Sequence, residues 1–380
     1  MTSPGAPPDE ALRDILQAGI RAPTADNRPV VRLRLAEDHV ALWAEPEVAA
    51  PLQPHRRALG LLATGAMVEN MALRSRRHGL ALQAAWLPAA TEPALLATLR
   101  WAPASAPLAA ADAMLDGAIE GRHTNRRFYR REPVPPPAVA AVNAAVAAVP
   151  GTSLQWLQGA ARRRGLQAVR LAEAERFRRA GLHGEMFDSI RFDLGWRATS
   201  DEGLPPATLE VEPPLRGGFA LLRHWPLMHA VRWLGVPWML GVRAGWLPCV
   251  TASHLGLLSV RRDHGEAGWL EAGRAFERLW LAAQSQGLAL QPMAAAVALT
   301  LQRPGGDWVS PSLQARLAGL LGGLVDPAQQ ACMLLRVGVA NKPNVVTARR
   351  LLSRYIDPSG LPLQNGEKLQ SNQRPARVDL

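Results

Sequence analysis

The chain has 380 residues, of which 48% are hydrophobic and 20% are charged, so it is long enough for two or three domain-sized units with a buried core. Its net charge of +11 comes almost wholly from arginine, since only Lys342 and Lys368 are lysines among 43 basic residues. The sequence has no zinc-ligand spacing, no aromatic RNA-binding motif and no basic low-complexity arm, which argues against a nucleic-acid-binding protein.

Three features bear on the compartment. The N-terminus lacks the basic and apolar regions of a secretory signal. The most apolar stretch, 219–260, is interrupted by arginines and has no run of roughly 18 uncharged apolar residues, so no membrane span is expected and a buried or interfacial helical hairpin is favoured. Cys249 and Cys332 lie in apolar surroundings and are expected to be buried thiols in a reducing compartment. We therefore expect a cytoplasmic protein.

Hydrophobic periodicity and turn signals predict the elements of the first third of the chain. After a disordered lead at 1–8, the expected elements are a helix at 9–20, a hairpin of strands at 30–35 and 39–43, a helix at 57–78, a strand at 80–87 and a helix at 109–120. Gly79 follows the long helix directly and is a common helix stop. The proline-rich run at 133–137 marks a boundary.

The remaining part of the chain is also predicted to mix helices and strands. In chain order we expect a helix at 138–148, a strand at 153–157, a helix at 166–179, helical pieces at 184–197 and 218–235, a strand with flanks at 246–257, a helix at 270–286, extended chain at 288–296, helices at 313–321 and 327–330, and a strand at 333–339. Residues 357–380 are expected to be a disordered tail.

Two stretches repeat each other without a gap. Residues 65–83 align with 273–291 at a constant offset of 208, and eight of the nineteen positions are identical, including Gly65/Gly273 and Glu69/Glu277. Convergence of two Ala/Leu-rich helices is one explanation. The match of glycines and glutamates favours the other, an internally duplicated fold. We expect two related halves that pack against each other within one chain, and such interfaces commonly bind cofactors.

The predicted halves are unequal. Residues 1–120 form the first half and residues 121–356 the second, and the segment at about 180–245 has no counterpart in the first half. This insertion is rich in Trp, Phe and Met, which is typical of a lid over a site. A structural hairpin that buries the seam between the halves is an equally good interpretation. His183 and Glu185 lie near its start and are candidates for lining a pocket.

The sharpest local motif lies at 122–128. Arg122 and Arg126 flank Thr124 and Asn125, and Phe128 follows. Arginine and threonine side chains supply the charge-assisted, geometrically fixed donors that bind a phosphate group. A solvated run of arginines is the alternative interpretation of the same residues.

Two further clusters complete the set of candidate residues. Thr24 and Asn27 lie in the polar segment 21–29 before the first predicted strand, where an ordinary turn is the alternative. Arg336, Arg349 and Arg350 lie near the end of the predicted globular region, where a basic surface helix is the alternative. Each cluster alone is weak evidence for a site.

Together the three clusters and the repeated helix resemble the flavin-dependent nitroreductase family. Arg122, Arg126 and Phe128 match the family's phosphate motif position by position, and Thr124 stands where the family has serine. Ala22, Pro23, Thr24 and Asn27 resemble its partner-facing motif, although Arg28-Pro29-Val30 replaces the usual Gln-Pro-Trp. The terminal arginines resemble the closing basic cluster of the family. The resemblance covers roughly 9–356 and is closest to the Acg-like branch, in which two unequal halves form a monomeric pseudo-dimer with a lid.

The resemblance implies a fold and a cofactor. The fold would be α+β and nitroreductase-like, with two halves fused as an intramolecular pseudo-dimer and a helical lid insertion. The cofactor would be FMN, bound by the candidate residues, with NADH or NADPH as the electron donor. Because only the second half carries the phosphate motif, one flavin per chain and a monomer are expected.

Two functions remain open from the sequence. The first is an oxidoreductase that acts on a small planar substrate by hydride exchange through the flavin, which needs no dedicated acid-base pair because the cofactor supplies the reactivity. The second is a non-catalytic protein that binds or sequesters FMN under the lid. A basic nucleic-acid-binding or membrane-surface protein is a third and weaker interpretation.

Overall fold

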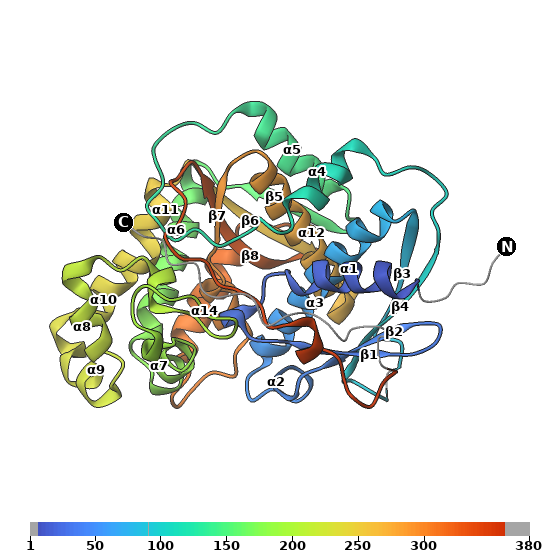
Figure 1. The fold of residues 1–380 in the computed structure, drawn as a ribbon. Helices are drawn as coiled ribbons and strands as arrows, with labels where there is room; N and C mark the ends of the chain where they lie inside the picture. Colours follow the sequence, from blue (N-terminus) through green and yellow to red (C-terminus); the bar gives the residue numbers. More distant parts are fainter. Residues whose placement is uncertain (1–6, 90, 362–380) are drawn as a thin grey trace.

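The computed structural model describes residues 7–89 and 91–361 (Figure 1). The first 120 residues form α1 (Asp9–Ile20), β1 (Val31–Leu35), β2 (Val40–Ala44), α2 (Pro46–Ala49), α3 (Pro54–Arg77), β3 (Leu80–Trp86), β4 (Leu95–Pro103) and α4 (Ala110–Ala118). The predicted disordered lead and tail lie almost entirely outside the described residues.

The following residues form more helices and a second set of strands. These elements are α5 (Pro136–Ala147), β5 (Thr152–Trp156), α6 (Gly159–Arg176), α7 (Ala180–Phe187), α8 (Arg216–Leu221), α9 (Trp225–Val231), α10 (Val236–Gly241), α11 (Leu247–Thr251), β6 (His254–Arg261), α12 (Gly265–Ser285), β7 (Ala289–Pro292), α13 (Ala295–Leu301), α14 (Pro311–Gly322) and β8 (Gln329–Gly338). The fold is therefore α+β, as predicted.

Each set of strands forms its own four-stranded antiparallel sheet. The order is β1-β2-β4-β3 in one sheet and β5-β6-β8-β7 in the other, so both place their first, second, fourth and third strands side by side. β1 shows why these segments become strands. Its valine and leucines at 31, 33 and 35 are buried, whereas Arg32 and Arg34 point outward, which is the period of two that a half-buried strand requires.

The repeated helices α3 and α12 cross between the two sheets (Figure 1). They meet at equivalent glycines in a reciprocal way. A Cβ atom at Gly65 would overlap the carbonyl oxygen of Leu270, and a Cβ atom at Gly273 would overlap that of Leu62. Gly79 and Gly287 follow the two helices with the same φ of +69°, which is the left-handed conformation that glycine adopts most readily.

The segment after β8 runs back across the first half. The backbone N–H of Leu33 donates to the carbonyl of Tyr355 at 2.7 Å, and that of Asp357 donates to the carbonyl of Leu33 at 2.8 Å. The pairing is parallel and covers the outer edge of β1. An otherwise open edge of the first sheet is thereby hydrogen-bonded to residues from the far end of the described chain.

The insertion forms a protrusion at one side of the molecule, beside α6 (Figure 1). It has a small hydrophobic cluster of its own, made by Phe177 at the end of α6 together with Met186, Phe187, Ile190 and Met228. No helix in the described ranges is long and apolar enough to cross a membrane.

Local predictions differ from the structure at several places, among them α13, which was not predicted, and the helix expected at 184–197, which is α7 and ends at Phe187. The segment expected as a strand from 246 forms a helical turn and then α11, and β6 begins only at His254. Pro248 cannot donate to a strand ladder but fits the first turn of a helix, which explains the difference. The helix expected at 327–330 is a turn that leads into β8, and β4 was not predicted at all.

The glycine crossing makes a stability prediction. Gly65→Ala and Gly273→Ala should each lower the free energy of unfolding by about 1–3 kcal/mol or more, because the new methyl group forces two helix backbones apart. Gly319→Ala in α14 is the matched control, since no atom lies within 4 Å of its Cβ position, and it should be neutral or slightly stabilising. Urea unfolding of the three variants checks this, and equal stabilities would contradict the close approach.

Candidate functional site

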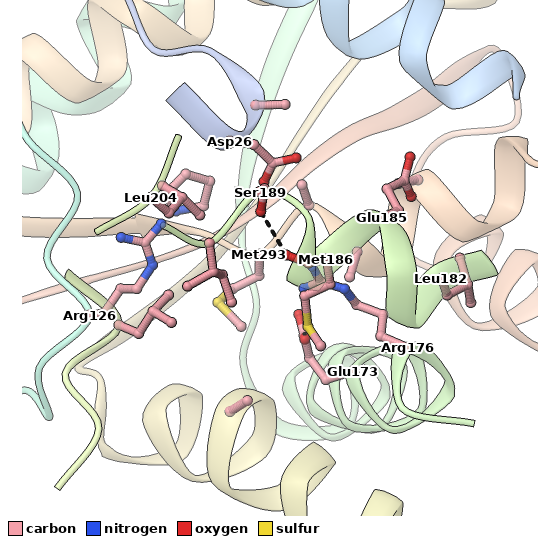
Figure 2. A pocket seen from close by; sticks show the side chains of 18 of the residues that line it. Asp26, Arg126, Glu173, Arg176, Leu182, Glu185, Met186, Ser189, Leu204 and Met293 are labelled. Carbon is pink, nitrogen blue, oxygen red and sulfur yellow. Dashed lines mark hydrogen bonds and ion pairs between the residues drawn. The ribbon is translucent and has the colours of Figure 1, made fainter. Parts of the chain in front are cut away.

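A large cavity lies where residues 23–60, residues 124–176 and the insertion meet (Figure 2). Its volume is about 720 Å³, which is in the range of pockets that hold cofactors and drug-sized ligands. The loop at 23–30 and the start of α3 contribute from the first half. The loop at 124–126, α6, α7 and the segment that follows β7 contribute from the second half, and residues between 204 and 244 add to the lining.

Much of the cavity wall is apolar. Leu182 and Met186 of α7, together with Leu204 and Met293 from two other segments, point into it (Figure 2). The unbranched methionine side chains adapt to flat or irregular ligands. The lining therefore suits a planar, largely apolar group with a few polar anchors.

Most charged side chains on the wall are paired with each other. Glu173 pairs with Arg176 at 3.1 Å, and Glu185 lies 2.8 Å from Arg56. Glu185 is also 3.1 Å from the ring of His55. Burial works against ionisation of Glu185, but the hydrogen bond from His55 and the nearby arginine charges hold its pKa below the usual value. These groups balance one another without a ligand.

Two charged side chains on the wall have no ion pair among the described residues. Arg126 donates one hydrogen bond, from Nη1 to the carbonyl of Thr208 at 3.2 Å, and burial lowers its pKa. The carboxyl of Asp26 faces the cavity, and burial raises its pKa although neighbouring arginines oppose the effect (Figure 2). The guanidinium of Arg126 and the carboxyl of Asp26 are thus the charged-type groups of the wall that lack an ion pair among the described residues.

The backbone that carries Asp26 is unusual. Asp26 and Asn27 are consecutive non-glycine residues with φ of +57° and +55°, a left-handed conformation that asparagine and aspartate tolerate better than other residues. The side-chain amide of Asn27 donates to the carbonyl of Gly203 at 3.3 Å and of Ser200 at 3.4 Å. These bonds tie the loop to the insertion and keep Asp26 directed at the cavity.

The structure brings three of the nine predicted site residues to the cavity wall. Thr24, Thr124 and Arg126 line it. The other six lie outside its lining. Side-chain N–H groups of Asn125, Arg336 and Arg349 donate hydrogen bonds to oxygen atoms of the protein.

Arg122 lies one layer behind the wall. Its guanidinium is 3.1 Å from the carboxylate of Glu277 and stacks on the ring of Trp280 at 4.6 Å, and Trp280 itself lines the cavity. Glu277 is fully buried, which raises its pKa, while the charge of Arg122 opposes that effect. The pair supports the aromatic part of the wall.

Arg336 is fully buried in a similar position. It donates to the side-chain oxygen of Gln291 at 2.8 Å, to the carbonyl of Pro248 at 3.0 Å and to that of Arg127 at 2.7 Å. Gln291 and Pro248 line the cavity, so Arg336 fixes two wall segments. Its three nitrogens all donate to protein oxygens.

Arg349 and Arg350 tie the C-terminal segment to other parts of the site. Arg349 donates to the side-chain oxygen of Asn27 and, at 3.1 Å, to the carbonyl of Ala22, and Arg350 pairs with Glu202. Asn125 acts in the same way, because its amide donates to the carbonyl of Asn341 at 2.9 Å. Cofactor binding by these residues stays a prediction, and in this arrangement they hold the loops that form the wall.

Several wall residues were not predicted. Arg56, His55, Glu173 and Arg176 carry no motif, because their place depends on how α3 and α6 pack. Of the two candidates near the start of the insertion, Glu185 lines the cavity. His183 does not line it, and its ring lies 2.8 Å from the carbonyl of Leu222.

A second, shallower hollow of about 430 Å³ adjoins the cavity. The two share Arg126 and Arg243, and the hollow is also lined by Arg127, Arg130 and Arg216. Glu210 and Glu212 are the acidic residues among its lining. The outer end of the site therefore favours anionic groups.

The buried pair makes a second stability prediction. Arg122→Met should lower the free energy of unfolding by about 3–5 kcal/mol, because it leaves the Glu277 carboxylate buried without a partner. Arg122→Met combined with Glu277→Leu should recover most of that loss. Arg32→Met, which breaks an exposed pair with Glu45, is the control and should cost at most about 1 kcal/mol. Thermal and urea unfolding measure all four proteins, and a single variant as mild as the control would refute the structural role.

Comparisons with known proteins add a limited finding. No protein-family model matches the chain, and no curated protein matches it. Similar solved structures include the FMN-dependent nitroreductase NfnB of Mycobacterium smegmatis in complex with NADPH, at 20% identity and TM-score 0.37 over 64% of this chain and 96% of that one. They also include an iodotyrosine deiodinase bound to FMN and 3-iodo-L-tyrosine, at 13% identity and TM-score 0.34 over 62% and 95%. A nitroreductase with bound FMN from Bacteroides fragilis matches at 15% identity and TM-score 0.31 over 62% and 94%.

Proposed function

We propose that the protein is an FMN-binding oxidoreductase with a nitroreductase-like fold, which acts on a small planar substrate by hydride exchange. The observation that carries the proposal is the unpaired Arg126 at the junction of an apolar cavity and an arginine-lined hollow. This combination suits a ligand with a flat apolar part and an anionic tail.

The residues present fit FMN. The cavity volume of about 720 Å³ accommodates a three-ring system with a ribityl chain. Arg126 and the hydroxyl of Thr124 would hold the phosphate, and the neighbouring hollow offers further arginines. Asp26 and Thr24, which belong to the first half, would form hydrogen bonds with the polar groups of the ligand. When bound, FMN would supply the hydride chemistry.

The chain itself would provide orientation and exclude water. Met186, Leu204 and Met293 would confine a planar group between apolar surfaces. Residues between 204 and 244 add to the lining of the cavity, and as a lid they would restrict entry to small molecules. NADH or NADPH is the electron donor that we propose for such a site. A protein that stores FMN without turnover has the same wall, and the experiment below separates the two.

We also infer that the two halves arose by duplication and act as a pseudo-dimer. The identical strand order of the two sheets supports this, as do the reciprocal contacts at Gly65 and Gly273. Within the part of the chain that the structure describes, only the loop at 124–126 places an arginine without an ion pair at the cavity. We therefore propose one FMN per chain and a monomer in solution.

The visible absorption spectrum of the purified protein tests the proposal. After incubation with FMN and removal of the excess, we expect a yellow protein with one FMN per chain, and light scattering should show a monomer. Addition of NADH or NADPH without oxygen should bleach the flavin. A loaded protein that stays yellow with both donors would favour storage of FMN, and a protein that cannot be loaded would overturn both functions.

Arg126 gives the residue-level prediction. Arg126→Ala should weaken FMN binding about ten- to a hundredfold, because a charge-assisted contact to phosphate is worth roughly 1.5–3 kcal/mol. Binding of riboflavin should change much less, since riboflavin lacks the phosphate. Arg163→Ala on the exposed side of α6 is the control and should bind both ligands as the wild type does. Fluorescence titration measures the constants, and equal losses for both ligands would place the phosphate elsewhere.

A further inference from the structure

The tip of the insertion exposes large apolar side chains. Trp233 and Leu234 are 80% and 78% exposed, and Trp238 and Met239 are more than half exposed. Trp233 and Leu234 belong to the turn η5 (Arg232–Leu234), which joins α9 to α10 at the outer part of the protrusion (Figure 1). Exposed apolar groups gathered in one short segment mark an interaction surface more often than chance exposure does. The question is which partner this surface fits.

The positive charge around the tip of the insertion indicates which kind of partner it binds. No acidic residue occurs from position 213 to position 262, whereas Arg216, Arg223, Arg232 and Arg243 lie within the insertion. Arg223 lies over the ring of Phe192 at 5.4 Å, and Arg232 lies over the ring of Trp233 at 4.9 Å. Neither has a carboxylate partner among the described residues. The tip therefore presents tryptophan and leucine together with uncompensated positive charge.

We propose that the tip of the insertion docks on a membrane surface that contains anionic lipids. Tryptophan prefers the boundary between headgroups and acyl chains, and arginine side chains pair with lipid phosphates at the same depth. In the docked protein Trp233 and Leu234 enter this boundary, and Arg223 and Arg232 lie at the phosphate level. The net charge of +11 adds a longer-range attraction to an anionic surface.

A second copy of the chain is a poorer partner for this surface. Self-association through the tip would bring two cationic surfaces together without an acidic residue from 213 to 262 to neutralise them. A bilayer has no such conflict, because its phosphates supply the missing negative charge.

The docking surface is continuous with the cavity. Met239 is exposed at the tip and also lines the cavity, and Leu215 does the same on the other side of the insertion. Docking therefore brings side chains that line the cavity close to the bilayer.

Vesicle flotation of the full chain tests the docking independently of any flavin. Vesicles of phosphatidylcholine with one quarter phosphatidylglycerol should bind the protein, and vesicles of phosphatidylcholine alone should bind it much less. Added salt should weaken binding to the anionic vesicles. Absence of binding to the anionic vesicles would overturn the proposal, whatever the FMN experiments show.

Two double variants and one control locate the surface. Trp233→Ser with Leu234→Ser should lower the partition coefficient by about tenfold or more, and Arg223→Gln with Arg232→Gln should do the same for anionic vesicles only. Leu52→Ser, at a leucine that is 74% exposed on the first half, should bind as the wild type does. All positions are exposed or half-exposed, so circular dichroism should show unchanged folding. Binding that survives both double variants, or a dimer that either one abolishes, would assign the surface to another role.

Discussion

The close crossing of α3 and α12 is the constraint on which the rest of the structure depends. Gly65 and Gly273 let the two backbones touch, so the two sheets are held at a fixed distance on either side of one helix pair. Any larger residue at either position would move one half relative to the other. The cavity lies between parts of both halves, so its width follows from this contact.

The arginine residues act in two layers around that cavity. Arg126 meets the open space, whereas Arg122 and Arg336 stand behind Trp280 and Gln291 and fix them. A buried guanidinium with several acceptors is a rigid support, because every bond has a defined direction. The motif at 122–128 therefore contains both Arg126, which meets the cavity, and Arg122, which holds the wall behind it.

Local patterns allowed most of the fold to be predicted. The helix at 9–20 follows from its own periodicity, and the two long repeated helices follow from periodicity and from the glycines after them. The error at Trp246 arose because an apolar run with a proline fits a strand end and a helix start equally well until its neighbours are known. Thr24, Thr124 and Arg126 were found from short motifs, whereas Arg56 and Arg176 required the packing of α3 and α6. Residues within one short motif could be predicted from the sequence. Residues that reach the cavity only because distant helices pack together could not.

The pairing of the C-terminal segment with β1 has a consequence for biosynthesis. Asn27 receives its hydrogen bond from Arg349, which is 322 positions later in the chain. During translation the first half emerges long before the residues that cover the edge of its sheet and hold its cavity-lining loop. The nascent first half therefore has an open sheet edge and an untethered loop, and the cavity wall is completed only in the last stage of synthesis.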